Sequence, residues 1–134
     1  MLMAVENNTK FNLYRKHSSS TVYLSDDGIM KVVYEDNLVL GPEDFEPVVA
    51  DYVEAGKGEL LRILAIFPKH TNLSIEGRKY IQERDIPAIA EAVVFTTLGQ
   101  RLLFKFYQKF RAVEYPIKGF KTEAEGLQWL NEYA

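Results

Sequence analysis

The sequence contains no cysteine, only two histidines and no surplus of basic residues. Without cysteine the chain cannot form a disulfide, a thiolate nucleophile or a cysteine-ligated zinc site. The two histidines, His17 and His70, stand far apart, and a metal site needs more ligands at helical or turn spacing. We therefore expect no metal and no cofactor.

Charge and hydropathy exclude two further classes of protein. Lys and Arg number 16 against 19 Asp and Glu, giving a net charge of −3. Such a chain has no basic excess to neutralise phosphates, which disfavours nucleic-acid binding. No apolar run approaches the ~20 residues of a membrane-spanning helix. The apolar patch at residues 1–5 is too short for a signal peptide and Glu6 follows it, so we expect a cytoplasmic protein.

The apolar content predicts one globular domain. The 134 residues are 47% hydrophobic and include 8 Phe and 8 Tyr. This supply is enough to build a core at a length typical of single domains. Residues 1–18 mix polar, basic and apolar types without a clear period, so we interpret them as a mobile N-terminal arm. Residues 19–134 are expected to form the domain.

Turn and periodicity signals predict an α/β fold. Asp27-Gly28 lies between two β-branched and aromatic runs, which indicates a β-hairpin. Thr122-Glu-Ala-Glu125 is a capping box that opens the last helix. Strands are expected at 21–26, 29–35, 60–67, 92–95 and 115–120, and helices at 41–56, 74–84, 98–110 and 122–130. After the hairpin, alternating βα units predict a mixed, mostly parallel sheet of about five strands with helices packed on it.

Three stretches give the chain a resemblance to a known group. They are the hairpin 23–34 with Leu40-Gly-Pro-Glu-Asp44, the segment 90–107 with Ala90-Glu-Ala-Val-Val-Phe95, and the segment 120–130. With these features the sequence resembles the STAS-like domains, the group of the bacterial anti-sigma-factor antagonists, and especially their small stand-alone STAS/SEC14-like relatives. The resemblance implies a STAS-like sheet and regulation through protein binding rather than catalysis.

The resemblance also points to the loop before residue 75. In the anti-sigma antagonists an Asp-Ser-x-Gly serine at a helix N-terminus is phosphorylated. The equivalent stretch here, Lys69 to Gly77, has Leu73 before Ser74, and its glycine comes one residue late. We take His70, Thr71 and Ser74 as candidates for a partner-binding or phospho-acceptor loop. A plain helix N-cap is the commoner role of a serine at such a position, and no nucleophile-elbow pattern surrounds Ser74 to support a catalytic triad.

A second candidate surface lies on the helix expected at 98–110. Its apolar stripe contains Leu98, Leu102, Leu103, Phe106 and Phe110. Phe104 lies opposite Leu102 on a helical wheel, with Gln108 and Arg111 beside it. An exposed aromatic side chain among polar ones is typical of a partner surface, although Phe104 can equally belong to a second buried face.

These observations favour a non-enzymatic regulatory or interaction domain that binds a protein partner or forms a homodimer. The alternative is a binder or carrier of a small apolar molecule or lipid, because the many Phe and Tyr side chains can line a pocket. We expect no catalytic residues, although an active site built from Tyr, Glu and Arg leaves no motif in one sequence.

Overall fold

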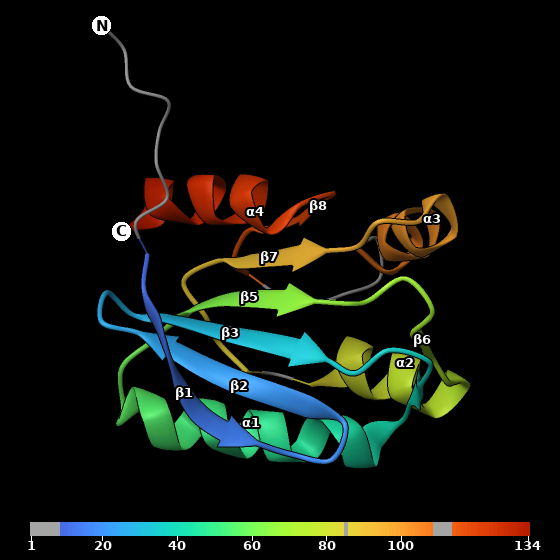
Figure 1. The fold of residues 1–134 in the computed structure, drawn as a ribbon, viewed down its shortest axis with the longest axis horizontal. Coiled ribbons are helices and arrows are strands. Elements are labelled where there is room, and N and C mark those ends of the chain that lie inside the picture. The colour runs from blue at the N-terminus through green and yellow to red at the C-terminus, as the bar shows by residue number, and fades with distance from the viewer. Residues whose placement is uncertain (1–8, 85, 109–113) are drawn as a thin grey trace, which may run out of the picture.

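The computed structural model describes residues 9–84, 86–108 and 114–134, with residues 106–108 as backbone alone. A six-stranded sheet has the order β1-β2-β3-β5-β7-β8, and β4 pairs with β6 in a separate two-stranded sheet (Figure 1). The strands are β1 (Phe11–Lys16), β2 (Ser20–Ser25), β3 (Ile29–Tyr34), β4 (Val39–Leu40), β5 (Arg62–Ile66), β6 (Asn72–Leu73), β7 (Glu91–Val94) and β8 (Ile117–Phe120). The helices are α1 (Pro42–Gly56), α2 (Ile75–Glu83), α3 (Leu98–Gln108) and α4 (Glu123–Leu130), followed by a 3₁₀ turn, Asn131–Tyr133.

The predicted fold class is confirmed. β1, β2 and β3 pair antiparallel, and β3, β5, β7 and β8 are mutually parallel. α1, α2 and α3 connect the parallel strands, as the alternation of apolar patterns predicted. β8 forms one edge of the sheet, which agrees with the Pro116 and Gly119 signals in that strand.

Helices cover both faces of the sheet. α1 and α2 lie on one face and α4 lies on the other (Figure 1). The continuous apolar run of β5 serves both layers, because Ile63 belongs to the core under α1 and Leu64 to the core under α4. Both side chains are buried, as expected for a strand covered on two faces.

The hairpin was predicted correctly, but its turn differs from expectation. Residues 26–28 connect β2 to β3, and only Gly28 has a positive φ, at 88°. Asp27 stays outside the left-handed region, so the loop is a three-residue turn with one left-handed glycine rather than a two-residue turn with two.

The expected N-terminal arm is wrong for residues 11–16, which form β1 at the edge of the sheet. A β-bulge interrupts its pairing with β2, since Leu13 lies opposite Tyr23 and Arg15 opposite Val22, leaving Tyr14 as the extra residue. A bulge breaks the alternation of side chains. The strand therefore showed no clear period in the sequence.

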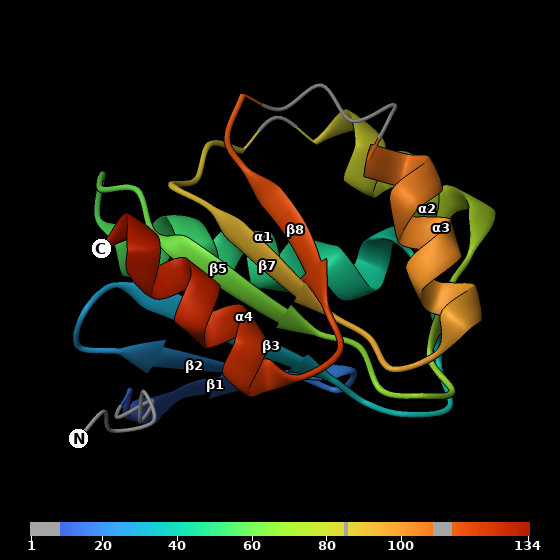
Figure 2. The ribbon, with the colours of Figure 1, turned by 90° about the horizontal axis from the view of Figure 1, so that it is seen from above.

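Helices α2 and α3 stand together at the end of the molecule toward which the parallel strands run (Figure 2). The loop after β5 leads through β6 into α2, and the loop after β7 leads into α3. Ligands of parallel α/β sheets bind at this carboxyl end. In the described part of the chain, no helix is long and apolar enough to cross a membrane.

Candidate functional site: a cavity between the sheet, α2 and α3

A cavity of about 90 Å³, counted as the space open to the centre of a water molecule, lies between the sheet face, α2 and α3. A single water sphere occupies about 10–15 Å³, and the space open to sphere centres is the smaller of the two measures, so this cavity holds several waters. The cavity therefore has room for a ring-sized organic molecule, whereas a long acyl chain needs more space. Its lining comes from the sheet (Ala65, Val93), from the segments after β5 and β7 (Phe67, Phe95) and from the helices (Ile81, Leu103, Phe104).

Aromatic rings form much of the cavity wall. Tyr34 stacks on Phe67 with ring centroids 4.8 Å apart, and Phe67 lies 6.4 Å from Phe95. Phe95 in turn packs against Phe104 at 5.0 Å. These four residues come from the ends of three strands and from α3, so the row of rings connects the sheet to the helix. Such a wall offers a flat apolar ligand extensive contact.

Few polar groups reach the cavity. Arg84, at the C-terminal end of α2, faces Glu91 of β7, with Nη2 3.6 Å from Oε2. Burial disfavours the charged guanidinium, but Glu91 and the neighbouring phenols more than offset it, and the pKa of Arg84 is raised. Burial also raises the pKa of Tyr34 far above its ordinary value, so its phenol stays neutral. The site thus combines an apolar body with one buried ion pair.

Gln100 of α3 joins the cavity to the loop after β5. Its Nε2 donates to the carbonyl oxygens of Pro68, at 2.8 Å, and Thr71, at 2.9 Å. Two carbonyl acceptors fix the orientation of the amide, because only the nitrogen can donate. Gln100, Leu103 and Phe104 occupy i, i+3 and i+4 positions, so this face of α3 points toward the cavity.

The sequence left Phe104 open between an exposed partner surface and a second buried face, and the structure shows it packed on the cavity side. Its ring packs on Phe95, whereas Leu98 and Leu102 of the expected core stripe are 63% and 57% exposed. α3 has apolar residues on two arcs, and Gln100, whose amide bonds to the neighbouring loop, lies on the arc that faces inward. The side chain of Gln108 and the whole of Arg111, also named for this surface, lie outside the described residues.

The three candidate residues of the 69–77 loop have different environments. Thr71 is 1% exposed and donates to the carbonyl of Glu35 at 2.6 Å. Ser74 is the N-cap of α2 and accepts from the backbone N–H of Gly77 at 2.9 Å, the structural role foreseen for it. The His70 ring is exposed, and its Nδ1 lies 3.3 Å from Oδ2 of Asp36.

Asp36, which follows β3, binds the backbone and the ring of His70 in this loop. Burial opposes ionisation of its carboxyl, but hydrogen bonds from the backbone N–H groups of His70 and Asn37 prevail, and the pKa of Asp36 is lowered. Glu35 and Asp36, which follow β3, therefore hold the loop in place. The phospho-acceptor role of Thr71 and Ser74 stays a prediction.

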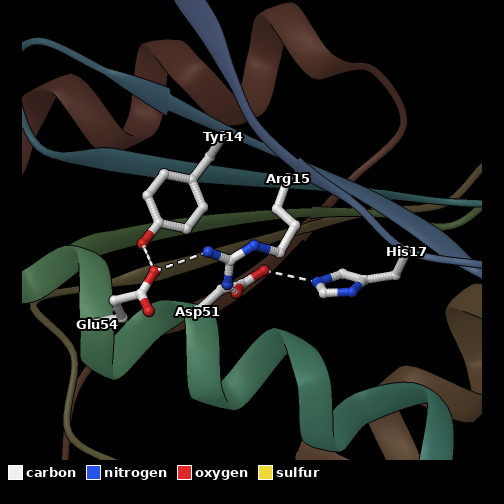
Figure 3. Close-up of polar contacts among 5 residues, drawn as sticks. All are labelled: Tyr14, Arg15, His17, Asp51 and Glu54. Carbon is white, nitrogen blue, oxygen red and sulfur yellow. Dashed lines mark hydrogen bonds and ion pairs between the residues drawn. The ribbon is translucent and has the colours of Figure 1, made fainter.

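Sequence reasoning missed a polar cluster between β1 and α1 (Figure 3). Asp51 of α1 is 1% exposed and accepts from Arg15 Nη1 at 2.5 Å, and its second oxygen lies 2.6 Å from His17 Nε2. Glu54, one turn later, contacts Tyr14 and Arg15. The hydrogen bond from Tyr14, together with Arg15, lowers the pKa of Glu54, and the same bond raises the pKa of Tyr14. We call these five residues the β1–α1 clasp.

The bulge in β1 makes the clasp possible. In regular alternation Tyr14 and Arg15 would point to opposite faces of the sheet, but the extra residue lets both reach α1. Asp51 was the one readable signal, since a carboxylate on the buried face of an amphipathic helix requires a partner. No group of three or more metal-ligating side chains gathers at a common point among the residues that the structure describes.

Residues 22–134 match the sequence pattern of a family described as Domain of unknown function (DUF7793). The chain belongs to the DUF7793 family. The match begins in β2 and includes every residue that lines the cavity, as well as Asp51 and Glu54 of the clasp. The β1 half of the clasp precedes the matched part of this DUF7793 chain.

One solved structure supports the fold of the DUF7793 domain. It is similar to an uncharacterized DUF3478-family protein with a SpoIIAA-like fold from Shewanella loihica PV-4, with 16% identity, a TM-score of 0.51, and coverage of 97% of this chain and 99% of that chain. A protein of unknown function from Arthrobacter sp. FB24 is 19% identical, with a TM-score of 0.31 and coverage of 82% and 97%, respectively. None of the curated proteins matches the chain.

The SpoIIAA-like neighbour confirms a STAS-like fold for the DUF7793 domain and leaves its function open, because one fold carries many functions. The function has to be argued from the site. Among the described residues, the cavity combines apolar walls with a few fixed polar groups, which is the composition of a small-molecule binding site.

Proposed function

We propose that this domain binds a small, largely apolar molecule in the cavity between the sheet, α2 and α3. The observation that carries the proposal is the row of rings from Tyr34 to Phe104, which lines about 90 Å³ of space at the carboxyl end of the parallel strands. Apolar pockets with few polar groups at this end of α/β sheets commonly bind ligands. The size favours a ring-sized ligand.

A titration with ethylbenzene tests the proposal. Amide cross-peaks of residues around the cavity should shift saturably in a two-dimensional NMR spectrum. Filling the cavity with Ala65→Leu from the sheet side, or with Leu103→Trp from the helix side, should remove the saturable shifts. Val53→Gln is the matched control, because Val53 is also a large apolar side chain on a helix but is 63% exposed and does not line the cavity. Binding that survives both filling variants, or no binding by the native chain, would reject the proposal.

Protein binding remains a second proposal, and the outer face of α3 is its best support. Leu98 and Leu102 are large apolar side chains exposed one turn apart on this helix. A second copy of the chain is the simplest partner for such a surface, as in the homodimer that we predicted from sequence. The Leu98→Gln/Leu102→Gln double variant should then convert a dimer into a monomer in light-scattering measurements. A native chain that is monomeric at all concentrations would contradict self-association.

A further inference from the structure

Two of the described residues that line the cavity each carry a buried polar atom without a partner. In the described part of the chain, four buried side-chain atoms lack a hydrogen bond: Ser20 Oγ, Arg84 Nε, Gln100 Oε1 and Arg101 Nε. Two of them, on Arg84 and Gln100, belong to residues that line the cavity. Buried polar atoms usually have a partner, so two exceptions at one cavity call for an explanation.

Arg84 differs from Arg62, another arginine with little exposed surface. The Arg62 side chain is 3% exposed, and its guanidinium donates to the carbonyl oxygens of Leu130, at 3.1 Å, and Asp27. The Arg84 side chain is 16% exposed, and its contact with Glu91, at 3.6 Å, is longer than a hydrogen bond. Arg62 is thus a buried arginine satisfied by the fold itself. Arg84 has its charge balanced by Glu91 but retains an unused Nε–H donor.

Charge balance decides what kind of group would use that donor. Glu91 is 4% exposed, and its Oε1 accepts from the Tyr115 hydroxyl at 3.2 Å, so its carboxylate stays beside Arg84. A second carboxylate, brought in by a ligand, would meet a site that is already neutral and would be repelled by Glu91. An uncharged oxygen acceptor uses the Nε–H without this repulsion.

Gln100 adds a complementary requirement at the α3 side of the cavity. Because its Nε2 is committed to the carbonyls of Pro68 and Thr71, the amide cannot flip to relieve Oε1. The free oxygen accepts and cannot donate. A ligand O–H or N–H would therefore gain a hydrogen bond there.

We propose that the cavity takes an uncharged, ring-sized molecule that carries a carbonyl or amide oxygen, with that oxygen accepting from Nε of Arg84. This inference rests on the proposed function and specifies its ligand class. A donor group on the same molecule, where it reaches α3, bonds to Oε1 of Gln100. The class comprises aryl ketones, aryl amides and related neutral compounds, and it excludes simple aromatic acids.

Three probes of similar size test the ligand class. Ethylbenzene, acetophenone and benzoate share one ring and differ in carrying no acceptor, a neutral acceptor or a charged one. In NMR titrations acetophenone should bind more tightly than benzoate. The ketone oxygen of acetophenone should accept a hydrogen bond from Nε of Arg84. Removing the Arg84 guanidinium should therefore lower the ratio of acetophenone to ethylbenzene affinity by about tenfold, since hydrogen bonds to charged groups are the stronger ones.

The variants must remove the donor without leaving a lone buried charge. Arg84→Met alone strands Glu91 and can unfold the chain. The double variant Arg84→Met/Glu91→Gln keeps the site neutral and is the main test. Arg101→Met is its matched control, because Arg101 also has a buried Nε without a partner but does not line the cavity, so the affinity ratio should stay unchanged.

The outcomes separate this inference from the proposed function. If ethylbenzene binds and the affinity ratio is the same in the native chain and the double variant, the role of Arg84 is refuted while the cavity remains a binding site. If benzoate binds most tightly and loses its affinity in the double variant, the ligand is an anion and the neutral class is wrong. If none of the probes binds the native chain, the proposed function itself fails.

Discussion

Gly77 lies where the first turn of α2 meets the backbone of β4. A Cβ built at this position would lie 2.2 Å from the carbonyl oxygen of Leu40, an atom of the backbone that has little freedom to move. Gly77 therefore makes room for β4 under the first turn of α2. In the anti-sigma antagonists, which the sequence resembles, a glycine belongs to a phosphorylation motif. Here the glycine has a packing reason of its own.

Gly77→Ala should destabilise the domain by about 1–3 kcal/mol, as overpacking does elsewhere. The matched control is Gly99→Ala in the first turn of α3, where an added Cβ meets nothing within 4 Å. That change should be neutral or stabilise by up to about 1 kcal/mol, because alanine is the better helix former. Urea unfolding of both variants gives the two values. Equal midpoints would show that α2 can move away from β4 at no cost.

At the residue scale, the sequence allowed some roles to be predicted and hid others. The N-cap at Ser74 was readable because a serine before a helix usually caps it. The position of Phe104 stayed open between exposed and buried, because the room for its ring comes from a glycine far away in the sequence. A Cβ at Gly119 would come within 3.2 Å of the Phe104 and Phe95 rings, so the glycine of β8 makes room for them. Such complementarity between distant residues leaves no periodic signal.

At the scale of elements, the β1–α1 clasp attaches the edge strand to the first helix. Asp51 holds both Arg15 and His17, and β1 is an edge strand of the sheet among the described residues. Asp51→Ala should therefore release β1 before the rest of the sheet. We expect faster amide hydrogen exchange in β1 and a loss of about 2 kcal/mol, less than for a fully buried ion pair because Arg15, at 46% exposure, can be rehydrated.

Lys16 is a charged residue of β1 that does not belong to the clasp, so its replacement is the control. Lys16→Ala removes a side chain whose ion pair with Glu35 is long, at 3.9 Å, and exposed on both sides. Exposed pairs of this kind contribute little, so exchange in β1 should stay as in the native chain. Faster exchange in Lys16→Ala than in Asp51→Ala would mean that the clasp does not hold the strand.

The clasp also predicts how stability depends on acid. The pKa of Glu54 is lowered in the folded chain, so Glu54 stabilises the fold above its ordinary pKa, near ~4.3, and loses this effect as the pH falls through the lower folded value. The thermal midpoint should fall less steeply with acid in Glu54→Gln than in the native chain. Glu46→Gln, an exposed change on the same helix, should keep the native slope. If the thermal midpoints of Glu54→Gln and the native chain fell equally steeply with acid, Glu54 would not contribute to the pH dependence of stability.

At the scale of the whole molecule, the order of elements was predictable because it rests on local signals. The Asp27-Gly28 turn, the apolar run of β5 and the capping box at Thr122 each act within a few residues. What the sequence concealed is contacts between distant segments. β1 becomes an edge strand through a bulge and through Asp51 of α1, and the cavity exists because α2 and α3 meet over the ends of separate strands. No window of the sequence contains both halves of either feature.

A chain that starts at residue 19 decides whether the N-terminal segment is an arm or part of the sheet. Removing a mobile arm would leave stability unchanged. Removing β1 exposes the pairing edge of β2 and leaves the buried carboxylate of Asp51 without Arg15 and His17, at a cost of about 3 kcal/mol or more. We expect a lower urea midpoint and a tendency of the open edge to aggregate.

The same truncation should abolish the effect of Asp51→Ala, which identifies the cause of the lost stability. In the native chain Asp51 is the partner of Arg15 and His17, so its removal destabilises the fold. In the chain from residue 19 both partners are gone, so the removal of Asp51 should have little effect. The coupling between the two changes, measured as a double-mutant cycle in urea, isolates the clasp from the general loss of a strand. If the two free-energy changes simply add, β1 is held by its backbone pairing with β2 alone.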